Sequence, residues 1–185
     1  MSDDGPDSSR QRYTRPAGKS GGHGIGWTQF APYTFVLPRE CGFEEVPVSI
    51  ADLGGTELDL RFESQSHGSI AVVVAPQARF TESLSSDIQK LGTIDTMIDG
   101  FAPEIIGQPL NEGAVGEQTE VMQASGKRVF QYLLDQQVGK SRRTLVSMLA
   151  NGNRLYIFSL KATPLQWRKN EESLRAIQKS FDIIL

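Results

Sequence analysis

Two neighbouring segments near the C-terminus constrain the fold of this chain more than any other feature. Residues 143–150 and 153–160 flank the pair Asn151-Gly152, the strongest two-residue signal for a β-hairpin, because both turn positions need a positive φ. Apolar side chains occupy both faces of the two strands: Leu145, Val146, Met148, Leu149, Leu155, Tyr156, Ile157 and Phe158. A sheet with one solvated face would alternate apolar and polar residues instead. We therefore expect a sheet that is covered on both sides.

Other segments predict further strands around this hairpin. They are short runs rich in β-branched and aromatic residues, and two of them flank a Ser125-Gly126 turn. The predicted strands are residues 33–37, 57–62, 70–74, 118–124 and 128–135.

Two helices can be predicted from their boundary residues. Thr93 is placed to cap a helix whose apolar residues recur with helical spacing, and we expect Pro103 to end it. Thr163 begins a second helix, with Pro164 in its first turn and Gln166 completing a capping box. The apolar stripes are Ile94, Met97, Ile98 and Phe101 in the first helix, and Trp167, Leu174, Ile177 and Phe181 in the second. Together these elements predict an α+β fold in which a central antiparallel sheet is sandwiched between helices.

The first residues differ in composition from the rest. Residues 1–24 contain Tyr13 as their only large apolar side chain, among Ser, Gly, Pro and mixed charges, so we predict a disordered N-terminal tail. A docking arm that folds on a partner is the alternative. The remainder, residues 25–185, is long enough for one core and is predicted to form a single domain.

Bulk properties exclude several classes of function. The formal net charge is −3, so no overall positive field would draw the protein to nucleic acid or to an anionic membrane. The longest apolar runs are far shorter than the ~18–20 residues of a membrane span. Cys41 is the single cysteine, which excludes an intramolecular disulfide.

Metal ligands are scarce in this sequence. The two histidines and the cysteine lie in three separate segments, and none has the spacing that puts two ligands on one metal. Asp52, Glu57 and Asp59 could supply oxygens to a hard ion such as calcium or manganese, the only cofactor that the sequence suggests. The alternative is that Glu57 and Asp59 form the solvated face of a strand, because residues 57–62 alternate strictly between polar and apolar.

Catalytic constellations are not evident, and we predict that the chain is not an enzyme. Its Gly-Lys-Ser triplets lack the first glycine of a phosphate-binding loop, and there is no nucleophile elbow. Cys41 is expected to be a buried or idle thiol in a loop, with a thiol-redox role as the less favoured alternative. His67, beside Gly68, is expected to be a solvated turn residue.

Basic side chains gather at two places if the second half is a simple meander. One cluster lies at the end that carries the Gly126 and Gly152 turns, and the other lies one strand length away. Either could dock an acidic partner, or could serve only to keep hairpin tips soluble. The clusters are Lys127, Arg128 and Arg154, and Lys140, Arg142 and Arg143.

The order of motifs from Tyr33 to the C-terminus resembles the PsbP family of thylakoid-lumen proteins. Each motif is weak alone, but their order and spacing make the resemblance fairly specific. The residues that carry it are 33–38 (YTFVLP), 55–63 (GTELDLRFE), 72–76 (VVVAP), 128–135 (RVFQYLLD), 151–158 (NGNRLYIF) and Trp167 with Ser180-Phe181.

The resemblance implies an α/β/α sandwich of the PsbP/Mog1 type. It also implies an extrinsic protein of the chloroplast thylakoid lumen that acts on photosystems without catalysis, which would account for the absence of a visible targeting segment. The founding member helps retain calcium and chloride at the oxygen-evolving side of photosystem II, and many relatives assist assembly of photosynthetic complexes. Residues 45–55 are similar to those of PsbP-domain relatives, which favours an accessory or assembly factor of photosystem I or II. A calcium- or manganese-binding subunit of the oxygen-evolving complex is the alternative. We expect a monomer whose partner is a photosystem complex or assembly intermediate.

Overall fold

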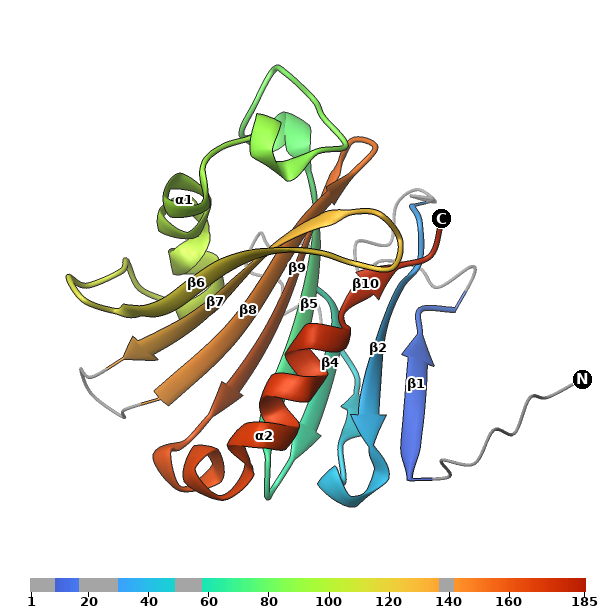
Figure 1. The fold of residues 1–185 in the computed structure, drawn as a ribbon, viewed down its shortest axis with the longest axis vertical. Helices are drawn as coiled ribbons and strands as arrows, with labels where there is room; N and C mark the ends of the chain where they lie inside the picture. Colours follow the sequence, from blue (N-terminus) through green and yellow to red (C-terminus); the bar gives the residue numbers. More distant parts are fainter. Residues whose placement is uncertain (1–8, 17–29, 49–57, 137–141) are drawn as a thin grey trace, which may run out of the picture.

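A seven-stranded antiparallel sheet forms the centre of the computed structural model, which describes residues 9–16, 30–48, 58–136 and 142–185 (Figure 1). The strands lie in the order β3-β4-β5-β9-β8-β7-β6, and every neighbouring pair is antiparallel. Their bounds are β3 (Glu44–Val46), β4 (Leu58–Ser64), β5 (Gly68–Pro76), β6 (Val115–Met122), β7 (Arg128–Gln136), β8 (Arg142–Asn151) and β9 (Arg154–Ala162). The last four strands are neighbours in chain order, which is the simple meander assumed when the two basic clusters were placed.

Different elements cover the two faces of this sheet. On one face lie α2 (Pro164–Ser180) and a small sheet of β1 (Arg10–Thr14), β2 (Tyr33–Pro38) and β10 (Asp182–Ile183) (Figure 1). The other face carries α1 (Ile94–Ile106) and the short helix η4 (Ile88–Lys90). Two further short helices, η1 (Arg39–Cys41) and η3 (Gln77–Arg79), follow β2 and β5.

Side chains of β8 show directly that both faces are buried. Leu145 and Leu149 pack into the core on the α2 side, whereas Val146 and Met148 pack into the core on the α1 side. All four are at most 1% exposed, and burying an aliphatic side chain of this size contributes about 1.5–3 kcal/mol. The doubly covered sheet expected from the sequence is confirmed.

The N-terminal ends of both helices follow the predicted capping chemistry. The Thr163 hydroxyl accepts a hydrogen bond from the Gln166 backbone amide at 3.2 Å, and the Gln166 side-chain oxygen accepts one from the Thr163 backbone amide at 2.9 Å. Thr93 caps α1 in the same reciprocal way with Thr96. Each cap pairs backbone donors that the first helical turn leaves free.

Pro103 does not end α1, contrary to the prediction. The helix continues to Ile106, and the Gly107 amide donates to the Pro103 carbonyl at 3.0 Å. Pro103 is exposed, so the carbonyl that lacks its hydrogen bond lies on the solvent side and can be hydrated. The next turn is held by Ile105, which is buried against the sheet.

The central hairpin is confirmed, but its turn is shifted by one residue. Asn151 belongs to β8 and pairs with Arg154, so the two central turn residues are Gly152 and Asn153. Only Gly152 has a positive φ, 59°. Glycine at the first central position is the pattern of a type II′ turn, which needs one positive φ rather than two.

Strand β1 lies within the segment that was predicted to be disordered. Arg10–Thr14 pairs with β2 from Pro38 to Thr34, and the Tyr13 ring centroid lies 5.2 Å from that of Phe35. Composition missed this strand because its order comes from backbone pairing to β2 and from a single aromatic anchor. Residues 1–8 and 17–24 of the predicted tail lie outside the described residues.

Candidate functional site

Asp59, a predicted ion ligand, is buried in an ion pair. Its carboxylate accepts two hydrogen bonds from the Arg15 guanidinium, at 2.8 and 3.1 Å, and a third from the Tyr33 hydroxyl. The two charged side chains are only 5% and 3% exposed. Burial and the Asp59 carboxylate raise the pKa of Tyr33 well above its ordinary value, so this tyrosine remains a donor. Asp59 therefore lies neither on a solvated face nor free for a metal.

A β-bulge explains why the alternation in β4 misplaced Asp59. The register shifts between Leu58 and Leu60, which pair with the adjacent residues Val73 and Val72. The stretch from Leu58 to Leu60 therefore contains one residue more than the β5 stretch with which it pairs. This extra residue breaks the regular alternation of side chains between the two faces of the sheet at Asp59.

No metal centre forms among the residues that the structure describes. Within them, no group of three His, Cys, Asp or Glu side chains is placed to hold an ion. The other two predicted ligands, Asp52 and Glu57, lie outside the described residues. An acidic groove of about 680 Å³ lies between α1 and β6, and its acidic lining residues are Asp95, Asp99, Glu112 and Glu117. Asp95 there already accepts a hydrogen bond from Gln118 at 2.8 Å.

Cys41 is buried, as the favoured interpretation of the sequence held. The residue is 0% exposed within η1, and burial raises the pKa of its thiol to about 11. A thiolate is the nucleophilic and redox-active form, and this environment disfavours it. The thiol-redox alternative therefore loses its chemical basis.

His67 is also buried, which corrects the prediction of a solvated turn residue. Its side chain is shielded beside Phe43, and its Nδ1 lies 2.6 Å from the Ser66 hydroxyl. Burial lowers the pKa of His67, so the neutral imidazole is the favoured form.

The basic cluster at the Gly126 and Gly152 turns is partly engaged within the protein. Lys127 donates to the Ser86 carbonyl at 3.1 Å, and the Arg128 guanidinium lies 3.6 Å from the Glu120 carboxylate. Such contacts hold the cations near the surface but reduce their availability to a partner.

The second cluster is divided between the two faces of the sheet. The Arg143 guanidinium lies 3.8 Å from the Asp135 carboxylate and 5.3 Å from the Trp167 ring centroid, on the α2 side. Arg142 is exposed, and as the preceding strand residue it points to the opposite face. Lys140 lies outside the described residues. On the α1 side Arg142 is joined by Lys161, the last residue but one of β9, which the sequence alone did not single out because it lies in a largely apolar strand.

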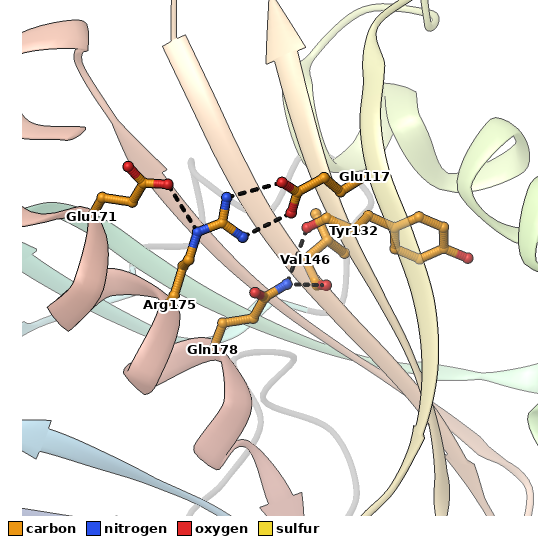
Figure 2. Close-up of polar contacts among 6 residues, drawn as sticks. All are labelled: Glu117, Tyr132, Val146, Glu171, Arg175 and Gln178. Carbon is orange, nitrogen blue, oxygen red and sulfur yellow. Dashed lines mark hydrogen bonds and ion pairs between the residues drawn. The ribbon is translucent and has the colours of Figure 1, made fainter. Parts of the chain in front are cut away.

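A groove of about 230 Å³ separates α2 from β6 and β7. Figure 2 shows Arg175 reaching from α2 to Glu117 of β6, with N–O distances of 2.7 and 3.1 Å, and to Glu171 at 3.1 Å. This arginine lowers the pKa of Glu117. The buried Gln178 amide donates to two backbone carbonyls, of β7 at 3.0 Å and of β8 at 2.9 Å. These contacts join α2 to the sheet and its edge strand, a network that the sequence did not reveal.

Comparisons with known proteins decide the family. A protein-family model described as PsbP matches residues 29–183. This chain belongs to the PsbP family. The family predicted from the sequence motifs is confirmed, and no helix of the described PsbP domain is long and apolar enough to cross a membrane.

Two curated relatives of this PsbP-family chain come from Arabidopsis thaliana, and both are chloroplastic. PsbP domain-containing protein 4 is 42% identical over 182 residues, covering 97% of this chain and 66% of the relative. PsbP domain-containing protein 6 is 24% identical over 161 residues, covering 82% of this chain and 60% of the relative. The chain thus spans somewhat less than two thirds of the length of these relatives.

A solved structure shares the fold. The solution structure of cyanobacterial PsbP (CyanoP) from Synechocystis sp. PCC 6803 matches with a TM-score of 0.65, covering 100% of this chain and 97% of that one. The sequence identity is 17%, so this similarity supports the architecture alone.

Proposed function

We propose that this PsbP-family protein is a non-catalytic accessory or assembly factor of photosystem I or II, acting in the thylakoid lumen. The observation that carries the proposal is the filled interior of the described fold. Both faces of the sheet are packed with apolar side chains, Asp59 is paired with Arg15, and the Cys41 thiol is buried. A protein with such an interior acts through its surface, which favours docking on a photosystem complex or assembly intermediate.

The basic end of β8 is the proposed contact region. Arg142 is exposed there, and Lys140 lies two residues earlier in the chain. In a protein with a net charge of −3, a local group of cations would orient an acidic partner and exclude basic ones. Arg143 contributes less, because it already contacts Asp135 and Trp167.

Co-sedimentation with thylakoid membranes tests this docking. We expect the variant Lys140→Glu/Arg142→Glu to associate at least about tenfold more weakly, because like charges facing each other cost several kcal/mol. The matched control is Arg168→Glu/Lys169→Glu, the same charge change at exposed positions of α2. Equal association of both variants and the wild type would remove the basic end from the proposal.

A further inference from the structure

The α1-side face of the sheet changes character along β8 and β9. From the Gly152 turn, its residues are first apolar and lie in the core beneath α1: Ala150, Met148 and Val146 in β8, and Leu155 and Ile157 in β9. Further along, the same face carries Thr144 and Arg142 in β8, and Ser159 and Lys161 in β9. We call Arg61, Ser69, Arg142, Thr144, Ser159 and Lys161 the polar patch.

Lys161 is the centre of this patch. It pairs across the sheet with Thr144 on one side and with Ser69 on the other, so these three side chains share a face. The lysine is half-buried, and within the described ranges its ammonium makes no ion pair. Burial and the charges of Arg142 and Arg61 all lower its pKa. Charges in such surroundings are normally paired, and no described residue supplies a counter-ion to this lysine.

Thr144, which lies opposite Lys161 on β8, is a second polar side chain of this face with an unpaired group among the described residues. This threonine is 0% exposed, and its hydroxyl has no hydrogen-bond partner in the part of the chain that the structure describes. An unpaired buried hydroxyl costs roughly as much as a lost hydrogen bond, and native proteins rarely keep one without a reason. Because Thr144 is fully covered, an external oxyanion would reach the half-buried ammonium of Lys161 and the exposed guanidinium of Arg142, two cations on adjacent strands of this face.

We propose that the polar patch binds a carboxylate group from an acidic protein segment, with Lys161 as its ionic partner. A carboxylate is already bound to a cation at the margin of the patch, where that of Glu63 lies 3.1 Å from the Arg61 guanidinium. The large hydrophobic side chains exposed in the described structure belong to none of the strands that form the patch, β4, β5, β8 and β9. A lipid headgroup site would need such side chains around it to enter the bilayer, so a protein carboxylate suits this surface better.

Calorimetric titration of the full chain with an N-acetylated, C-amidated hexaglutamate peptide tests the inference. We expect Lys161→Met, which keeps the aliphatic stem, to weaken binding at least about tenfold, as for loss of a charged hydrogen bond. Lys169→Met on α2 makes the same change on the other side of the sheet and should alter binding by no more than about twofold. Thermal unfolding adds a second readout. Without peptide, Lys161→Met should unfold at a higher temperature, because an unpaired, half-buried charge is removed.

Three results would overturn this inference. The first is a Lys161→Met variant that binds the peptide as tightly as the wild type, and the second is an equal loss of affinity in Lys169→Met. The third is a lower unfolding temperature of Lys161→Met, which would make the lysine merely structural. Displacement of the peptide by inorganic phosphate at matched ionic strength would overturn the carboxylate assignment in favour of any oxyanion. The source of the carboxylate rests on the proposed docking function, but the two fail separately. Hexaglutamate can bind a protein that does not associate with thylakoid membranes, and association with thylakoids can persist in the Lys161→Met variant.

Discussion

Replacing Arg15 should destabilise this protein more than any other single change at its N-terminal strand. Arg15 and Asp59 are 5% and 3% exposed, and two hydrogen bonds of 2.8 and 3.1 Å join them. Arg15→Met would leave the Asp59 carboxylate buried without the guanidinium charge, although the Tyr33 hydroxyl would still donate to it. Removing one member of a buried ion pair typically costs about 3–5 kcal/mol, because the other charge stays desolvated and uncompensated.

That cost is large against the total stability of a domain, about 5–15 kcal/mol. Urea unfolding followed by circular dichroism measures it, and the midpoint should fall without a large change in slope. The control is Arg12→Met on the adjoining strand β1, because Arg12 is exposed and its replacement should cost no more than about 0.5 kcal/mol. The double variant Arg15→Met/Asp59→Leu should be more stable than Arg15→Met alone, since it removes the stranded charge together with its partner.

Two results would refute this reasoning. One is a loss in Arg15→Met no larger than in Arg12→Met, which would mean that the N-terminal strand is not held against β4. The other is a double variant that is less stable than Arg15→Met alone, which would mean that packing rather than charge is at stake. Either result would also contradict the ordered β-strand assigned to Arg10–Thr14.

Two further predictions concern neighbouring residues of the β4–β5 turn. Gly68→Ala should destabilise by at least about 2 kcal/mol in urea unfolding, because φ is 115° and a Cβ would lie 2.0 Å from the Lys161 carbonyl oxygen. Gly100→Ala, where no atom lies within 4 Å of a Cβ in helix α1, should instead stabilise by about 0.5–1 kcal/mol; equal effects would contradict the geometry. Burial lowers the pKa of His67, so the unfolded chain binds its proton more readily and stability should fall as pH drops below about 6.5. Unfolding midpoints measured between pH 7.5 and 5.5 should fall less steeply for His67→Gln, and an unchanged slope would argue against a buried neutral imidazole.

Local patterns allowed most of the architecture to be predicted. The apolar character of both faces at residues 145–158 predicted a doubly covered sheet, and the Thr163 cap predicted where α2 begins. Both signals act over a few residues, through hydrogen bonds and side-chain direction that hardly depend on distant partners. Where a local rule failed, a neighbour had changed its outcome. Pro103 stays inside α1 because Ile105 is anchored on the sheet, and Asp59 turns inward at a bulge.

The candidate sites depended far more on tertiary structure. The sequence named Arg142 and Arg143 as one cluster, but the sheet places them on opposite sides, and Lys161 joins Arg142 only because β9 returns beside β8. Arg15 and Asp59 are 44 residues apart, and no local pattern links them.

The sequence by itself thus determined the family, the two C-terminal hairpins and the sheet that is covered on both faces, because turn residues, side-chain periodicity and caps lie within each element. Only the tertiary structure decided which charges are buried, paired or left without a counter-ion. Those properties depend on what lies across a strand or beneath a helix, and a linear sequence carries no direct record of that arrangement.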